Sequence, residues 1–482
     1  MNKDFIVNLG FLVIINLIIK PIYIFGIDVG VQNVVGENYG LYFGLLNFTY
    51  LFLIIADVGI QQYNNRQIAF DPLQIQQLFP TLIRAKLLLI IPFLLFGWAG
   101  ALLTGYINDW RILIVIMGNQ LLVSFALFLR SNVSGLGMYR KDSILSVLDK
   151  LFMIVVCGFL LLNPDTKSEF TILTFLYTQT ASFVVVCIVA WWFLRGKNRF
   201  SLAHFDMGLL WPLVKKTIPF GLAVFLMTLY TRVDGVMIER LLPNGRFEAS
   251  VYAGGYRLLD AANMLAFLFP PLLLPMFSKL QNKQPELQKL LKLSFGLMWT
   301  LVVISAISCF AFRYEIMNLL YIQADQYWGR VFGVLILNFL WIGLIHVFGT
   351  FVTATGKMKA ANWVYLTCIV LNIMLNFLLI PDYKAWGAAM TTFVTHGAVV
   401  LGLCIIIRNH ITRPDFISIL FKGIVLLAIV ILIHWGIYEL NALHWIIRFT
   451  LGILCSLLLT FSIRFIDFRE LRASFQQSPK AQ

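Results

Sequence analysis

The chain has 482 residues, of which 60% are hydrophobic and only 12% are charged. A soluble domain carries about 25% charged residues, so this chain has more apolar surface than a soluble core can bury. Its long apolar runs lack strict alternation, which favours membrane helices over a membrane barrel. The composition therefore excludes a soluble protein and predicts an all-α polytopic membrane protein.

The apolar segments predict fourteen membrane-spanning helices, and each has about the 20 residues that cross a hydrocarbon core. They are expected at 5–28, 39–61, 86–106, 112–130, 144–163, 170–194, 217–239, 249–276, 293–312, 331–354, 362–381, 386–408, 420–438 and 444–464. The first is too long for a cleaved signal peptide and is expected to remain as a span.

The formal net charge is +14, and most Lys and Arg residues outside the spans fall in the tails and in loops of one side. Arg84 and Lys86 are assigned to one of these loops. Such a bias is the positive-inside pattern, so both termini are predicted to be cytoplasmic. The positive-inside pattern accounts for the net positive charge, so no nucleic acid is expected as a partner.

No Walker loop, HExxH, GxSxG or CxxC motif is present in the sequence. The six cysteines lie in apolar spans, which favours small hydrophobic side chains over disulfides or metal ligands. We therefore expect no enzyme activity, no cofactor and no bound metal of a catalytic kind.

The two halves of the chain share a layout. Lys20 and Arg232 fall at equivalent depths in the first and seventh spans, and each is followed by an acid and a polar hairpin. The spans after these hairpins also open alike, with YGLYFG from Tyr39 and YAGGY from Tyr252. A second echo pairs 130–162 with 353–380, where a Gly-basic turn precedes an apolar helix. Parallel repeats of this kind hold substrate between the halves near mid-membrane.

This repeat predicts two six-helix bundles of the same orientation, followed by two extra helices. The expected domains are an N-terminal bundle at 1–195, a cytoplasmic linker at 196–216, a C-terminal bundle at 217–410, and two further helices with a cytoplasmic tail at 411–482.

The segment 354–401 resembles a signature of the multidrug/oligosaccharidyl-lipid/polysaccharide (MOP) exporter superfamily. The matching residues are Gly356, Lys357, Lys359, Asn372, Asn376, Pro381, Gly387 and Ala388. Within the superfamily the chain looks most like the Wzx-type flippases for O-antigen or capsule repeat units. That resemblance implies a bacterial inner-membrane protein that moves an undecaprenyl-diphosphate-linked oligosaccharide to the outer leaflet by alternating access.

Two other members of the superfamily stay open as alternatives. Lipid II flippases also have fourteen spans, but they carry basic residues in the second span, where this chain has none. Cation-coupled multidrug exporters usually have twelve spans, so the last helix pair argues against them. A membrane polysaccharide polymerase is a third hypothesis, which the short outer loops disfavour.

Three cations inside predicted spans are the candidate substrate-binding residues: Lys20, Arg232 and Arg257. A charge at the bilayer centre costs about 2.5–3.5 kcal/mol, and a diphosphate would compensate these. Snorkelling towards the interface is the structural alternative for Lys20. For Arg257 the alternative is an ion pair with Asp260, which lies three residues later. Lys150, beside Asp149, is interpreted as structural or interfacial.

Acids and prolines of the same spans are further candidates. Asp28, Asp234 and Asp260 are candidates for binding a coupling ion, Na⁺ or H⁺, or for orienting the substrate. Pro21, Pro219, Pro270 and Pro271 are candidate hinges, because proline removes a helix hydrogen bond; static kinks are the alternative. The remaining partners expected are membrane lipids and other polysaccharide-assembly proteins, and the chain itself is expected to be a monomer.

Overall fold

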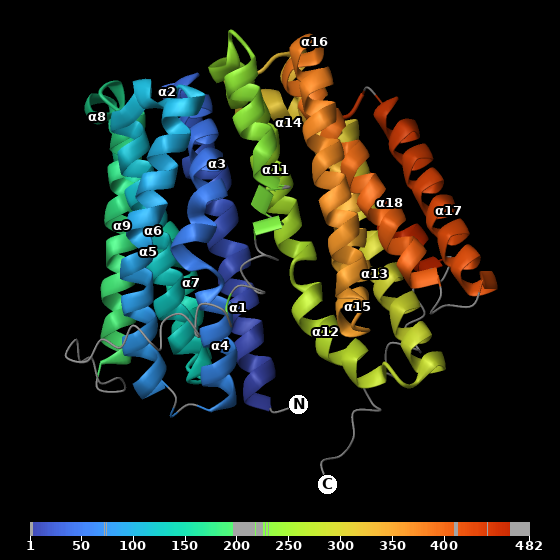
Figure 1. The fold of residues 1–482 in the computed structure, drawn as a ribbon. Helices are drawn as coiled ribbons and strands as arrows, with labels where there is room; N and C mark the ends of the chain where they lie inside the picture. The colour runs from blue at the N-terminus through green and yellow to red at the C-terminus, as the bar shows by residue number, and fades with distance from the viewer. Residues whose placement is uncertain are drawn as a thin grey trace. The chain divides into compact units, whose positions relative to one another are not determined.

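The computed structural model describes residues 3–71, 73, 75–195, 217, 225–226, 228–229, 231–408, 413–440 and 442–462. Every regular element in these ranges is helical, which confirms the predicted fold class (Figure 1). The linker at 196–216, Pro219 and the tail beyond 462 lie outside the described residues.

By contacts the chain separates into two compact units, Asn2–Ala253 and Gly254–Gln482. The first unit is a bundle built from the elements α1 Lys3–Pro21, the π-helix η1 Ile22–Asp28, α2 Val29–Val35, α3 Asn38–Asp57, α4 Ile60–Phe70, α5 Ile75–Thr104, the 3-10 helix η3 Tyr106–Asp109, α6 Trp110–Gly135, α7 Tyr139–Leu162, α8 Pro164–Ser168 and α9 Ile172–Leu194 (Figure 1). It also includes the helical residues 231–241 and the first part of α11 Gly245–Ala266.

The second unit begins inside α11. Its other elements are α12 Phe269–Leu280, α13 Gln284–Ala311, α14 Arg313–Leu320, α15 Gln326–Ala354, α16 Met358–Ile407, α17 Arg413–Tyr438 and α18 Trp445–Ser462.

Eleven helices in the described ranges are long and apolar enough to cross a membrane, and a shorter apolar helix covers Trp445–Thr460. One of the eleven, α16, contains two predicted spans that join at Lys384, whose backbone (φ 57°, ψ −138°) is not helical. The predicted seventh span is described only in part. The structure thus agrees with a polytopic membrane protein.

The second echo of the repeat is built identically in the two halves. Gly137 and Gly356 end their helices with φ of 75° each, which glycine adopts without strain. The amide of Met138 donates to the carbonyl of Val133, and the amide of Lys357 donates to that of Val352, at 3.1 and 3.0 Å. Both turns are Schellman motifs, so the same sequence signal stops α6 and α15.

Lys86 corrects the sequence interpretation, because it lies inside α5 and not in a loop. It is only 4% exposed and forms an ion pair with Asp57 at the end of α3. Its ammonium also donates to the Ser124 hydroxyl of α6 at 2.8 Å. A buried lysine needs such partners, so Lys86 ties three helices together at the point where the left-handed Val58 and Gly59 separate α3 from α4.

The last two helices dock on α13 of the second unit. The indole of Trp299 donates to the carbonyl of Gly423 at 2.9 Å. Ser308 and the imidazole of His434 are hydrogen-bonded at 2.8 Å, while the other ring nitrogen bonds to the carbonyl of Val430. His434 is therefore a packing residue with both nitrogens satisfied.

Candidate functional site

Close helix packing brings α3 against the hairpin that joins residues 231–241 to α11. A Cβ added at Gly40 would lie 1.8 Å from the carbonyl oxygen of Arg246, and one at Gly235 would lie 2.4 Å from the Asn47 amide. Only glycine permits these approaches. The side-chain amide of Gln32 also donates to Ser250. It lies 2.8 Å from the backbone carbonyl oxygen and 3.0 Å from the hydroxyl.

Two arginines fasten the same hairpin to the ends of α5 and α6. Arg240 pairs with the buried Glu239, donates to the carbonyl of Thr104 at 3.1 Å, and lies over the Tyr106 ring at 3.9 Å. Arg246 binds both carboxylate oxygens of Asp109, at 2.8 and 3.1 Å. Both hydrogen bonds come from one guanidinium nitrogen, so this is a bifurcated, charge-assisted contact.

Arg232 faces α3. Its guanidinium lies 4.8 Å from the centre of the Tyr50 ring and donates to the Asn47 side chain at 3.4 Å. The side chain is half-buried. The cation–π contact and the hydrogen bond to a neutral amide position the guanidinium against α3.

The two candidate acids of the first unit have matching partners. The Tyr39 hydroxyl donates to the Asp28 carboxylate at 2.7 Å, and the Tyr252 hydroxyl donates to that of Asp234 at 3.1 Å. All four side chains are buried. In each half, an acid of the span that carries the candidate cation thus accepts a hydrogen bond from a tyrosine near the start of the next span.

Lys20 lies on the side of α1 that meets α7. Its neighbours on that face are Asn16, which bonds to Ser146 of α7, and Tyr23, whose ring lies under Lys150 of α7. Lys20 is half-buried. Among the described residues it makes no hydrogen bond or ion pair.

Arg257 and Asp260 belong to the second unit. The Arg257 guanidinium and the Asp260 carboxylate are 3.9 Å apart, and their side chains are 19% and 34% exposed. This is a loose contact at the limit of an ion pair, between two partly exposed side chains.

Three of the candidate prolines, Pro21, Pro270 and Pro271, lie where an α-helix ends or begins. Pro21 ends α1 and is followed by the seven-residue π-helix, because a proline cannot donate the expected helix hydrogen bond. Pro270 and Pro271 lie in the first turn of α12, just after α11 ends at Ala266. Pro219 is outside the described residues, so its role stays a prediction.

A polar cluster between the two arms of α16 was identified in the sequence only as a signature. The side-chain amide of Asn376 donates to the side-chain oxygen of Asn372 at 3.1 Å. The side-chain amide of Asn372 donates to the hydroxyl of Thr395 at 3.4 Å. Nearby in sequence, the Thr391 hydroxyl is buried without a partner in the described part of the chain. Buried polar groups usually have partners, so ordered water suits this cluster.

The sequence interpretation missed the contacts of two lysines. Lys86 was assigned to a loop, whereas it is buried inside α5. Lys150 was interpreted as structural or interfacial, and it lies in the middle of α7 beside Asp149 and the Tyr23 ring. Asp57 and Tyr23, which belong to other helices, are distant in sequence from the lysines that they contact.

A family model described as "Polysaccharide biosynthesis protein" matches residues 6–281. No curated protein matches the sequence. A solved structure of the "Lipid II flippase MurJ, inward closed conformation" is similar with a TM-score of 0.68 and 14% identity, over 98% of this chain and all of that one.

An inward-facing multidrug resistance MATE family transporter of the MOP superfamily is similar with a TM-score of 0.61, 11% identity and coverage of 85% and 95% of the two chains. An outward-facing MATE structure gives a TM-score of 0.55, 13% identity and coverage of 86% and 96%. These likenesses establish the fold, and with the family match they confirm the resemblance that the signature at 354–401 indicated.

Proposed function

Because the chain belongs to the polysaccharide biosynthesis protein family, we propose that it flips an undecaprenyl-diphosphate-linked oligosaccharide across the bacterial inner membrane for surface polysaccharide synthesis. The family match over residues 6–281, on a fold shared with a lipid II flippase, is the observation that carries this proposal. Such lipids are made at the cytoplasmic leaflet, so the proposed movement is from that leaflet to the outer one. Both termini are cytoplasmic in this proposal, as the basic loops favour.

The diphosphate is the part of this substrate that costs most to move into hydrocarbon, since an unpaired buried charge is very unfavourable. Lys20, Arg232 and Arg257 supply compensating charge in the proposal. The contacts of Arg232 support its role, because a ring and a neutral amide of α3 orient its guanidinium. Arginine can bind two phosphate oxygens at once, while lysine acts as a point charge.

Asp28 and Asp234 are proposed to couple transport to a proton or sodium gradient. Support comes from their burial and from the tyrosine hydroxyl that each accepts. A buried carboxylate that changes charge alters its hydrogen bonds, and the adjacent Pro21 and π-helix offer a place where the first span can bend. Asp260 is proposed to orient Arg257. Alternating access of the two repeats around the substrate is the expected transport cycle.

Replacing Lys20 and Arg232 together by Ala should abolish surface polysaccharide, because the diphosphate then loses two of its three proposed cations. The measurement is complementation of a strain that lacks this gene, with surface glycan quantified and membrane levels of each variant matched by immunoblot. Arg111→Ala, which removes an exposed arginine beside Trp110, is the control and should keep full glycan.

Wild-type glycan in the Lys20→Ala/Arg232→Ala strain would contradict the proposal. Glycan unaffected by deletion of the gene, together with a rise in drug resistance on expression, would instead favour a cation-coupled exporter. Accumulation of lipid II in the deletion strain would favour the lipid II branch.

A further inference from the structure

A polar face of α11 continues into the second unit beyond Arg257. Asp260, Asn263 and Phe267 follow one another at spacings of three and four residues, so they lie on one face of the helix. The backbone amide of Phe267 donates to the carbonyl of Asn263 at 2.9 Å, which extends the last helical turn to this aromatic residue. Asn263 therefore lies between a charged pair and an aromatic side chain.

Helix α15 meets this face through His346. The imidazole Nε2 and the side-chain oxygen of Asn263 are hydrogen-bonded at 2.9 Å. The Phe267 ring stands edge-on to the imidazole, with ring centres 5.7 Å apart. An amide oxygen can only accept a hydrogen bond, so Nε2 carries the hydrogen and Nδ1 of the neutral ring is an acceptor. The contact thus fixes the direction of both side chains.

Asn263 and His346 each keep one polar atom that the protein does not use. In the part of the chain that the structure describes, no hydrogen bond involves the Asn263 Nδ2 or the His346 Nδ1. Neither atom is enclosed by surrounding side chains, and both residues are only half-buried. The Phe267 side chain is 62% exposed. A donor, an acceptor and an aromatic ring are therefore open at one place.

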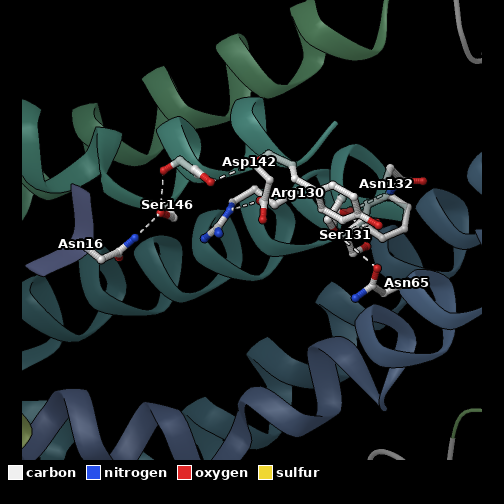
Figure 2. A network of polar contacts seen from close by, with 11 residues as sticks. Asn16, Asn65, Arg130, Ser131, Asn132, Asp142 and Ser146 are labelled. Carbon is white, nitrogen blue, oxygen red and sulfur yellow. Dashed lines mark hydrogen bonds and ion pairs between the residues drawn. The ribbon is translucent and has the colours of Figure 1, made fainter. Parts of the chain in front are cut away.

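Polar side chains on membrane helices often serve packing, and the first unit contains a network of this kind (Figure 2). There the Asn16 amide donates to the Ser146 hydroxyl at 3.0 Å. The Asn132 amide donates to the carbonyl of Phe128 at 2.7 Å. In both cases the amide nitrogen binds a neighbour in the same bundle. The Asn263 side chain differs, because only its oxygen has a partner among the described residues.

The chemistry of this face suits a sugar. Open polar atoms are unfavourable where a helix faces hydrocarbon, so the face is expected to meet water or a ligand. Sugar hydroxyls both donate and accept hydrogen bonds, and the C–H face of a sugar ring can pack on an aromatic ring. Ligand sites commonly combine an aromatic surface with a few polar groups that fix orientation. A neutral amide and a neutral imidazole fit uncharged hydroxyls, whereas a phosphate is bound best by cations.

We infer that Asn263, His346 and Phe267 form a sugar-binding subsite of the second unit, which holds a sugar ring of the lipid-linked substrate. This inference rests on the proposed function, in which Arg257 binds the diphosphate. Asn263 follows Arg257 by six residues, or about 9 Å along the helix, so the subsite lies beside the proposed diphosphate position. The Asn263 amide donates to one hydroxyl, the His346 Nδ1 accepts from another, and the Phe267 ring covers the C–H face.

The test measures how a sugar changes lipid binding by the full-length purified protein. The probes are undecaprenyl diphosphate, undecaprenyl-diphosphate-N-acetylglucosamine and phosphatidylglycerol, each titrated in detergent. Asn263→Ala should weaken binding of the sugar-bearing lipid about five- to tenfold, because hydrogen bonds to the sugar are lost. Binding of undecaprenyl diphosphate should stay that of the wild type. Phe267→Leu keeps an apolar side chain and should weaken only the sugar-bearing lipid, by about threefold.

His346→Gln separates a ligand contact from a structural one. The amide nitrogen of glutamine can take the place of Nε2 and donate to Asn263, but glutamine has no acceptor at the position of Nδ1. If His346 only braces Asn263, this variant should bind both undecaprenyl lipids like the wild type. If Nδ1 accepts from a sugar hydroxyl, the sugar-bearing lipid alone should bind about fivefold more weakly.

Asn132→Ala and His434→Ala are the matched controls. Both side chains are buried, and each bonds to a carbonyl one turn earlier in its own helix. Their loss removes packing contacts far in sequence from the subsite. The ratio between the affinities for the two undecaprenyl lipids should therefore change by less than about twofold in either control.

Losses in Asn263→Ala and His346→Gln that are confined to the sugar-bearing lipid support the subsite. Equal binding of the two undecaprenyl lipids by the wild type, equal losses of both in Asn263→Ala, or wild-type binding in His346→Gln overturns it and leaves the proposed function standing. Phosphatidylglycerol binding that depends on Asn263 assigns this face to the glycerol headgroup of bulk lipid and also overturns it. A wild-type protein that binds neither undecaprenyl lipid overturns the proposed function as well.

Discussion

Asp57→Asn should lower the stability of the first unit by about 3–5 kcal/mol, because it leaves the charge of Lys86 buried without a counter-charge. Asparagine keeps the shape of the side chain, so the loss reports the charge rather than a cavity. The Ser124 hydroxyl and the Ala56 carbonyl would remain as the other acceptors near the ammonium. Thermal unfolding of the purified protein in detergent measures the effect.

Two comparisons make this prediction specific. Asp57→Asn combined with Lys86→Met removes both charges and should restore most of the stability, since an apolar replacement of a buried pair is often neutral. Asp142→Asn breaks the Arg130–Asp142 pair, whose side chains are 24% and 20% exposed, and should cost about 1 kcal/mol or less. Equal stability of Asp57→Asn and Asp142→Asn would show that Lys86 does not depend on its carboxylate.

Gly40→Ala should disrupt the packing of α3 against α11. The new methyl group would lie 1.8 Å from the Arg246 carbonyl oxygen and 2.7 Å from the Ser250 amide nitrogen, both backbone atoms that a rotamer change cannot move. The helices must separate, at a cost of about 3 kcal/mol or more, and the Gln32–Ser250 hydrogen bonds should break. We expect surface glycan to fall at least about tenfold at equal membrane level, since this contact orients α11 and the helical residues 231–241 joined to it, which include Arg232.

Gly118→Ala is the control for this substitution. Gly118 lies in α6 of the same unit, and an added Cβ there would meet nothing within 4 Å. Alanine in a helix is favoured over glycine by about 0.5–1 kcal/mol, so this variant should be as stable as the wild type or more so. If Gly40→Ala behaved like Gly118→Ala in both stability and glycan level, the close contact of Gly40 with α11 would not be needed for stability or transport.

Apolar length alone predicted most of the spans, because a hydrocarbon core accepts only helices of a narrow length range. The repeat was also visible in the sequence, because the turns at Gly137 and Gly356 are local signals. Both turns are closed by the same pattern of backbone hydrogen bonds. Such features depend on residues close together in the chain, and a sequence displays them directly.

The contacts of the charged residues could not be read in this way. Lys86 was assigned to a loop because hydropathy cannot show that Asp57 and Ser124, on two other helices, satisfy its ammonium. Lys150 contacts the ring of Tyr23, which lies more than a hundred residues earlier in the chain. Gly40 carried no signal of its own, since only tertiary structure shows which backbone approaches it.

The π-helix after Pro21 has a consequence for how this protein can change over evolution. A π turn holds one residue more than an α turn, so Ile22–Asp28 behaves as a small insertion that the first span has absorbed. Loss of any single residue there would wind the segment back to regular pitch and swing Asp28 by about 100° around the helix axis. The carboxylate would then point away from the Tyr39 hydroxyl that it accepts. Length in this short segment is therefore expected to be under tighter selection than the identity of its apolar side chains.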